Sequence, residues 1–195
     1  RISHQVLGAA EEIMPYVYEN GHVLNTLLVS PPGCGKTTLL RDMIRQVSNG
    51  NIYGQGRQVA VVDERSEIAG SFMGTPQNDV GIRTDVLDGC PKVQGMMLLM
   101  RSMAPSVVAV DEIGGCEDLR AVYQILQCGS SVIATMHGST MEDVQRHMYF
   151  SEENGLLFDR FLFLEKKQGL CRVREIIDGR QKKVIWGLER KTCCV

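Results

Sequence analysis

The sequence predicts a protein of the α/β class, in which helices flank a mostly parallel sheet that ends in an antiparallel hairpin. Three observations support this prediction: short runs of apolar, largely β-branched residues, helical periodicity between these runs, and acids directly after two of them. Uninterrupted apolar runs are typical of strands that are covered on both faces. Strands that alternate with helices along a chain form parallel sheets.

The first half of the chain contains two of these strands. Apolar spacing predicts an amphipathic helix over residues 2–17, and the run at 26–29 predicts a buried strand. A glycine-rich segment leads into a helix over 38–47, and a second strand is predicted over 59–63. Because Gly, Pro, Asp, Asn and Thr dominate residues 64–92, we expect a long loop there.

The second half continues the alternation of helices and strands. Apolar patterning predicts, in order, a buried helix over 93–103, a strand over 107–112, a helix over 119–126, a strand over 132–135, a helix over 141–148 and a strand over 161–164. Polar and apolar residues then alternate over 171–177 and 183–188. Asp178 and Gly179 between these two runs predict a hairpin turn.

Composition excludes several classes of protein. The 195 residues include 44% hydrophobic and 23% charged residues, which is typical of one globular domain and excludes a disordered chain or a fibre. The net charge of −2 provides no general attraction to nucleic acid or to an anionic membrane. No apolar run approaches the roughly 18 residues of a membrane span, so we expect none.

The cysteines indicate the redox environment of the chain, and its first residue indicates that it is part of a longer protein. Seven scattered cysteines, an odd number, indicate free thiols in the reducing cytoplasm rather than a disulfide scaffold. The chain begins at Arg1 without an initiator Met. We therefore expect residues 1–195 to form one domain from the C-terminal part of a longer protein.

Residues 30–37, Ser-Pro-Pro-Gly-Cys-Gly-Lys-Thr, match a phosphate-binding loop at all but one position. Glycines let backbone N–H groups turn toward a phosphate, the lysine reaches the β and γ phosphates, and the hydroxyl binds Mg²⁺. The pattern G-x-x-x-x-G-K-[ST] has a glycine where this chain has Ser30, a minor departure at the start of the turn. The loop lies between a predicted strand and a predicted helix, whose N-terminus favours anions. The residues expected to bind a nucleotide are Pro32, Gly33, Cys34, Gly35, Lys36, Thr37 and Thr38.

Two acids at the end of the third predicted strand would complete a site for nucleotide hydrolysis. We expect Asp111 to hold Mg²⁺ together with Thr37, and Glu112 to activate the attacking water as a general base beside Lys36. A kinase does not need such a base, so Glu112 favours an ATPase. The alternative interpretations are a turn acid at a strand end for Asp111 and an exposed neighbour for Glu112.

Further candidates lie at the same edge of the predicted sheet, where ligands bind. Glu64 and Glu67 are candidates for ordering water or metal, or else belong to a solvated run of charges. His137 follows the fourth strand and is a candidate for sensing the γ-phosphate or contacting a neighbouring subunit, against a merely structural role. The candidates for stabilising transition-state charge, in cis or in trans, are Arg65, Arg83 and Arg101.

Six segments together resemble a family of stage III sporulation proteins from endospore-forming bacteria: residues 30–37, 62–67, 79–86, 100–105, 111–114 and 135–138. The segment Asp-Val-Gly-Ile-Arg-Thr-Asp-Val at 79–86 makes the resemblance specific, because it lies outside any general ATP site. That family is similar to the type II secretion and type IV pilus ATPases. The resemblance implies a RecA-like core that works as a hexameric ring, with residues 63–67 as an acidic box and His137 in a histidine box.

The resemblance also implies a cellular role. It implies an ATPase on the cytoplasmic, mother-cell side of a membrane channel complex, which drives or assembles a channel to the forespore. Its expected docking partner is a membrane-anchored protein of the same complex.

The leading hypothesis is an Mg²⁺-dependent ATPase motor subunit that hydrolyses ATP. A nucleic-acid motor on the same core is disfavoured by the near-neutral charge and by the lack of an aromatic and basic stripe, so we expect no nucleic-acid partner. A third hypothesis is a nucleotide-gated scaffold, in which ATP binding orders the loop over 64–92 with little turnover.

Overall fold

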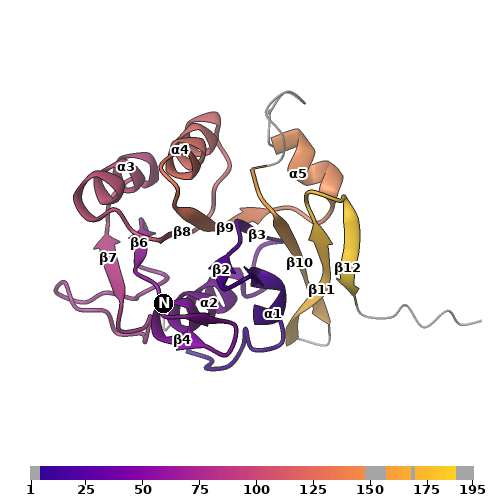
Figure 1. Cartoon of the computed structure of the whole chain (residues 1–195), viewed down its shortest axis with the longest axis horizontal. Helices are drawn as coiled ribbons and strands as arrows, with labels where there is room; N and C mark the ends of the chain where they lie inside the picture. The colour runs from indigo at the N-terminus through magenta and orange to yellow at the C-terminus, as the bar shows by residue number, and fades with distance from the viewer. Residues whose placement is uncertain (1–4, 148–156, 168–169, 188–195) are drawn as a thin grey trace, which may run out of the picture.

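One sheet runs through the molecule in the computed structural model, which describes residues 5–147, 157–167 and 170–187. Within these residues it has eight strands: β3 (Thr26–Ser30), β6 (Val59–Asp63), β7 (Thr84–Asp88), β8 (Val107–Val110), β9 (Ser131–His137), β10 (Arg160–Lys167), β11 (Leu170–Asp178) and β12 (Lys183–Gly187). Their order is β12-β11-β10-β3-β9-β8-β6-β7, from the right edge to the left edge of Figure 1.

The strands from β10 to β7 are parallel, and β11 and β12 extend the sheet as an antiparallel hairpin. The predicted class, a mostly parallel sheet with a C-terminal antiparallel hairpin, is therefore confirmed. The hairpin turn occupies residues 179–182, one residue later than predicted.

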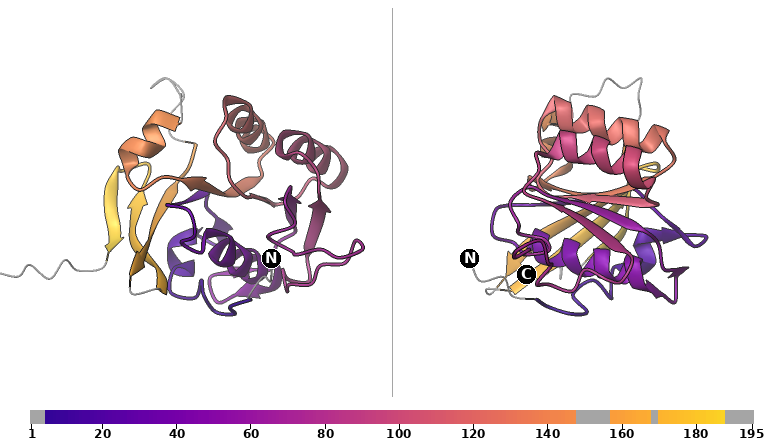
Figure 2. Two further views of the ribbon diagram at one scale, coloured as in Figure 1. Left: turned by 180° about the vertical axis from the view of Figure 1, so that it is seen from behind. Right: turned by 90° about the vertical axis from the view of Figure 1, so that its left-hand side faces the viewer.

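Helices cover both faces of this sheet. α2 (Lys36–Asn49) packs on one face, and α3 (Lys92–Met103), α4 (Cys116–Gln127) and α5 (Met141–His147) pack on the other, as the edge-on view in Figure 2 shows. In β3, Leu28 joins the buried cluster under α2, whereas Leu27 and Val29 join the cluster under α3 and α4. Burial on both faces explains why the strands are continuous apolar runs in the sequence.

The predicted helix over 2–17 is wrong for the residues that the structure describes. Only α1 (Met14–Val17) is helical, and residues 7–13 form turns. Gly8 has a positive φ of 82°, which a helix does not allow, and the Asp42 carboxylate of α2 accepts the N–H groups of Gly8 at 3.2 Å and Ala10 at 2.9 Å. A distant acid therefore binds the backbone groups that a helix would have used.

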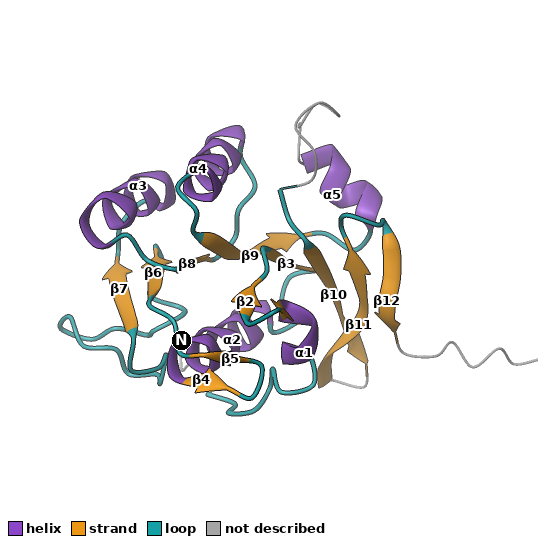
Figure 3. Ribbon diagram, viewed as in Figure 1, coloured by secondary structure: helices purple, strands orange, loops and turns teal. Residues whose placement is uncertain are grey.

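The predicted loop over 64–92 contains the edge strand β7, which pairs in parallel with β6. Residues 64–83 of this loop run from the end of β6 back to the start of β7 (Figure 3), and residues 89–91 lead from β7 into α3, which already includes Lys92. Two small hairpins were also not predicted: β1 (Tyr18–Glu19) with β2 (His22–Val23), and β4 (Gly50–Asn51) with β5 (Gly54–Gln55).

The other predicted helices and strands are present with ends shifted by a few residues; Met148 and Leu188 lie outside the described residues. The helix over 93–103 is not buried as predicted: α3 buries only Gly95, Met96 and Leu99, because it packs on the sheet and on α4 with one side and faces solvent with the other. Among the helices that the structure describes, none is both long enough and apolar enough to cross a membrane.

Candidate functional site

The glycine-rich segment forms the connection between β3 and α2, as predicted. Gly33 and Gly35 adopt φ values of +73° and +75°, which favour glycine because a Cβ would be strained there. No atom lies within 4 Å of the Cβ position at Gly33, whereas at Gly35 that position is 3.1 Å from the Cys171 sulfur of β11. Cys34 is buried, while Pro32 is exposed and Thr38 is half-buried.

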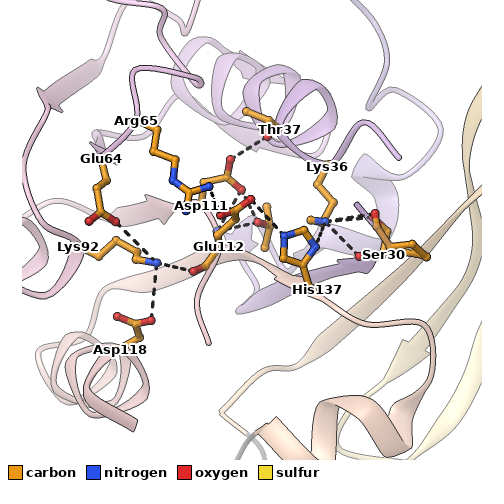
Figure 4. Close-up of polar contacts among 12 residues, drawn as sticks. Ser30, Lys36, Thr37, Glu64, Arg65, Lys92, Asp111, Glu112, Asp118 and His137 are labelled. Atoms are coloured by element: carbon orange, nitrogen blue, oxygen red, sulfur yellow. Dashed lines mark hydrogen bonds and ion pairs between the residues drawn. The ribbon is translucent and has the colours of Figure 1, made fainter. Parts of the chain in front are cut away.

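Lys36, at the start of α2, is 6% exposed and directs its ammonium group toward the loop and β9. Its Nζ donates to the Ser30 carbonyl oxygen at 3.1 Å and to Nδ1 of His137 at 3.0 Å (Figure 4). Burial lowers the pKa of Lys36, and the negative charges of Asp111 and Glu112 oppose this shift. Because an ammonium group only donates, Nδ1 of His137 is the acceptor in this contact.

Asp111 follows β8 and lies between two threonine hydroxyls. Thr37 donates to its Oδ2 at 2.8 Å, and Thr135 of β9 donates to its Oδ1. The fully buried Thr135 hydroxyl also accepts the Glu112 N–H at 2.9 Å. Thr135 therefore links both acids, and the sequence analysis did not identify it as a site residue.

Glu112 has a positive φ of 54°, which is uncommon for a residue other than glycine and is typical of functional sites. Its Oε1 lies 3.2 Å from Nε2 of His137, and its Oε2 lies 2.6 Å from Nη1 of Arg65. Its carbonyl oxygen accepts a hydrogen bond from Nζ of Lys92 at 2.5 Å. Lys92 is the second site residue that the sequence analysis missed.

A continuous polar chain therefore runs from Lys36 through His137 and Glu112 to Arg65 (Figure 4). Its members come from α2, from the end of β9, from the residues after β8 and from the residues after β6. The carboxyl ends of parallel strands meet at one edge of the sheet, which explains how residues so far apart in sequence come together.

The acids that follow β6 have different surroundings. Asp63 is 2% exposed, and its carboxylate accepts the N–H groups of Glu67, Ile68 and Ala69, so it stabilises the turn. Glu64 is exposed, unlike Asp63, and its Oε2 lies 3.7 Å from Nζ of Lys92. Asp63, Glu64 and Glu67 line one small cavity with Arg65, Lys92, Asp111 and Glu112.

Two of the three candidate arginines, Arg83 and Arg101, have their contacts outside the site of this same chain. Arg83 precedes β7 and donates to the Ser48 carbonyl oxygen at 3.1 Å, in the last turn of α2. Arg101 lies nine residues after Lys92 on α3, about 13 Å along the helix axis. It lines a separate, largely apolar cavity with Met97, Met100 and Tyr123 among others. Of the three arginines, the fold brings only Arg65 to Glu112.

Comparison with known proteins identifies relatives by sequence. A family model described as "Sporulation stage III, protein AA" matches residues 1–184. Stage III sporulation protein AA of Bacillus subtilis (strain 168) is 46% identical over 181 residues, which cover 91% of this chain and 58% of that protein. The protein SEEDLING PLASTID DEVELOPMENT 1 of Arabidopsis thaliana is 29% identical over 146 residues, 74% of this chain and 20% of that protein.

Solved structures with the same fold include two ATPases and a pilus retraction motor. The ATPase DotB of Legionella pneumophila superposes with a TM-score of 0.61 at 15% identity, covering 90% of this chain and 51% of that one. The VirB11 ATPase from the Brucella suis type IV secretion system, in complex with sulphate, gives 0.60 at 15% identity, covering 89% and 54%. The pilus retraction motor PilT with bound ADP gives 0.58 at 17% identity, covering 87% and 50%.

These structures confirm a RecA-like P-loop fold. The family match extends over nearly the whole chain, and the chain spans 58% of the length of the Bacillus subtilis relative. This chain is a member of the stage III sporulation protein AA family.

Proposed function

We propose that residues 1–195 form the Mg²⁺-dependent ATPase domain of a sporulation motor that hydrolyses ATP to ADP and phosphate. The observation that carries this proposal is the convergence of Thr37, Asp111 and Glu112 beside the glycine-rich loop, with Thr37 Oγ1 2.8 Å from Asp111 Oδ2. The loop supplies a phosphate-binding backbone, Thr37 and Asp111 supply metal ligands, and Glu112 supplies a base.

The donor atoms fit ATP and Mg²⁺. The positive φ values of Gly33 and Gly35 let backbone N–H groups face a phosphate, and α2 begins at the end of the loop. Mg²⁺ prefers oxygen ligands and is usually held by one or two protein groups together with phosphate oxygens and water. In the part of the chain that the structure describes, no three His, Cys, Asp or Glu side chains cluster around a metal position, so Thr37 and Asp111 would share the ion with the nucleotide. Bound Mg²⁺ would neutralise developing charge on the phosphates.

Each residue of the polar chain then has a role in the reaction. Lys36 provides a buried positive charge for the phosphates, and Glu112 accepts the proton of the attacking water. His137 hydrogen-bonds both residues and so connects phosphate binding to the base. Arg65 orients the Glu112 carboxylate through its ion pair, and Glu64 is a second candidate for ordering water.

The family and the fold support a proposal for the cellular role. Because the chain belongs to a sporulation family and shares its fold with secretion and pilus ATPases, we infer that the full-length protein forms a hexameric ring. The ring would act on the cytoplasmic, mother-cell side of a channel to the forespore and bind a membrane-anchored protein of that complex. Arg101 and Arg83 are exposed, so they are candidates to reach the site of a neighbouring subunit.

The test compares variants of the full-length protein in an enforced hexamer. We expect Lys36→Ala to lose nucleotide binding and Glu112→Gln to keep ATP binding while its turnover falls by about 100-fold or more. Glu117→Gln, which changes an exposed acid of α4, is the matched control and should hydrolyse ATP like the wild type.

Two outcomes would contradict this assignment. Undiminished hydrolysis by Glu112→Gln would exclude it as the base, and background turnover of the assembled wild-type ring would favour a nucleotide-gated scaffold. Adding single- or double-stranded DNA tests the alternative of a nucleic-acid motor, for which strong stimulation is expected.

A further inference from the structure

Lys92, the first residue of α3, contacts the backbone of Glu112 rather than only its charged neighbours. Its Nζ donates to the Glu112 carbonyl oxygen at 2.5 Å (Figure 4). The same ammonium lies 3.7 Å from Oε2 of Glu64 and 3.8 Å from Oδ2 of Asp118. The Lys92 side chain is 19% exposed, so its contacts are partly shielded from water.

Glu112 requires such support because of its backbone. Its φ of +54° is sparsely populated by residues with a Cβ, and such a conformation persists only where the surrounding structure holds it. The N–H group of Glu112 donates to Oγ1 of Thr135 at 2.9 Å and to Oδ1 of Asp111 at 3.1 Å. Lys92 binds the carbonyl group on the other side of the same residue. The two peptide units that flank Glu112 are therefore each held by a side chain, and the second is also held by its Ile113 N–H, which donates to the Thr135 carbonyl oxygen at 2.9 Å.

This backbone conformation directs the Glu112 side chain along the carboxyl edge of the sheet. The carboxylate lies between Nε2 of His137 at 3.2 Å and Nη1 of Arg65 at 2.6 Å. A rotation about the N–Cα bond of Glu112, away from its φ of +54°, would move the carbonyl oxygen and the side chain together and so take the carboxylate away from His137. The hydrogen bond from Lys92 opposes that rotation, and a charged donor makes the bond stronger than a neutral one.

The two ion pairs of Lys92 explain the position of its ammonium group less well than the hydrogen bond to the Glu112 carbonyl oxygen does. Both are longer than the bond to the carbonyl oxygen. Asp118 also accepts the N–H groups of Gly114 at 3.0 Å and Gly115 at 3.2 Å, so its carboxylate has partners at the N-terminus of α4 without Lys92. The carbonyl of Glu112 is thus the contact that defines where the ammonium lies.

We propose that Lys92 is a positioning residue that holds the Glu112 backbone so that the Glu112 carboxylate faces His137 and Arg65; its effect on hydrolysis rests on the proposed function, whereas its effect on Glu112 geometry does not. The residue acts through Glu112 and contacts neither the glycine-rich loop nor the proposed metal ligands in any hydrogen bond described for it.

The test uses Lys92→Met, which keeps the apolar stem and removes the ammonium, and Lys92→Arg, which keeps a cationic donor. In the full-length hexamer, we expect Lys92→Met to lower kcat by about 10- to 100-fold, the effect of losing one hydrogen bond to a charged group. The KM for ATP should stay within about 3-fold, because the phosphate-binding groups are unchanged. Lys92→Arg should recover most of the loss.

A second readout does not depend on turnover. The NMR signals of the His137 ring in the unliganded protein should move in Lys92→Met toward their positions in Glu112→Gln, since both variants remove the carboxylate from Nε2. Asp118→Asn is the matched control, because it removes the longer ion pair and keeps an oxygen for the N–H groups of α4. Its His137 signals and its kcat should match the wild type.

The outcomes separate this proposal from the proposed function. Wild-type His137 signals in Lys92→Met, or an effect of Asp118→Asn as large as that of Lys92→Met, would overturn the positioning role. If the wild-type ring does not hydrolyse ATP, the proposed function fails while the His137 signals still decide the role of Lys92. Should Lys92→Met not fold, Lys92→Leu makes the same test with a shorter side chain that also lacks a donor, and the same shift of the His137 signals is expected.

Discussion

Replacing Thr135 with valine tests whether one hydroxyl organises both acids of the site. Thr135 is fully buried in β9, donates to Oδ1 of Asp111 and accepts the N–H of Glu112 at 2.9 Å. Valine has nearly the same shape and cannot form hydrogen bonds. Thr135→Val therefore removes the two interactions with little change in packing.

The expected cost follows from these two interactions. A hydrogen bond to a charged group contributes about 1.5–3 kcal/mol, and an unsatisfied buried donor costs about 1–3 kcal/mol. The two effects overlap, because Asp111 keeps its bond from Thr37 and the Glu112 N–H keeps Oδ1 of Asp111 at 3.1 Å. We expect the free energy of unfolding to fall by about 2–3 kcal/mol, which lowers Tm by about 4–12 °C for a domain of this size.

The assay is urea denaturation of the nucleotide-free protein, together with ATP turnover of the assembled ring. Thr135→Ser keeps the hydroxyl and should recover most of the stability and of the turnover. Thr26→Val is the matched control, because the Thr26 hydroxyl is equally buried and donates only to the Leu24 carbonyl oxygen at 2.9 Å. It should cost about 1 kcal/mol and leave turnover unchanged.

The reasoning would be refuted if Thr135→Val unfolded within about 0.5 kcal/mol of the wild type, the range of neutral surface changes. It would also be refuted if Thr26→Val lowered turnover as much as Thr135→Val, since general destabilisation would then explain both.

Two further predictions concern the anchor of the N-terminal turns and the glycine-rich loop. Asp42→Ala should lower the free energy of unfolding by about 2–4 kcal/mol, because it leaves the buried Ala10 N–H and the half-buried Arg45 guanidinium without their acceptor. Glu12→Ala on the exposed side should change it by less than about 0.5 kcal/mol. Burial acts to raise the pKa of Asp42, but hydrogen bonds from backbone and side chains outweigh it and the pKa lies below its usual value. A lowered carboxyl pKa stabilises the fold above the unfolded-state pKa, so the difference between wild type and Asp42→Ala should shrink as pH falls below about 4, measured by urea denaturation. Gly35→Ala should lose nucleotide binding in calorimetry, because the φ of +75° costs alanine about 1–2 kcal/mol and its Cβ would lie 3.1 Å from the Cys171 sulfur. Adding Cys171→Gly should relieve the contact without restoring binding, and full recovery would show that the backbone strain is unimportant.

The parallel core was predictable because strands that are buried on both faces consist of nearly continuous apolar residues. Thr26–Ser30 and Val59–Asp63 are fully buried, and their apolar runs are visible without a structure. By contrast, residues 2–17 carry helical spacing, yet the backbone N–H groups of Gly8 and Ala10 are bound by Asp42, which lies more than thirty residues away. The periodicity of apolar residues along a chain gives no information about such a distant acceptor.

The edge strand β7 was missed for a related reason. Its residues, Thr84–Asp88, are only half-buried, and three of the five are polar. Its strand conformation depends on pairing with the central strand β6. An edge position needs no apolar run, so the local composition indicated a loop.

The site shows the same division between local and distant information. The glycine-rich loop, Asp111, Glu112 and His137 were candidates because motif and strand position mark them, and the fold brings them together. Lys92 belongs to no motif, and Thr135 is only the first residue of the segment 135–138 that carries the resemblance. Their roles depend on backbone groups that they reach 20 and 23 residues away, which a motif does not reveal.

Cys171 of β11 limits how far the glycine-rich loop can shift toward the antiparallel hairpin. A Cβ at Gly35 would lie only 3.1 Å from the Cys171 sulfur, so little space is left between them, and packed protein is nearly incompressible. Because β11 is paired along β10, Cys171 acts as a fixed stop on this side of the loop. Burial, with a smaller contribution from Cys34, raises the pKa of Cys171 to about 11. The thiol stays uncharged at neutral pH, so this stop adds no negative charge beside the loop proposed to bind phosphates.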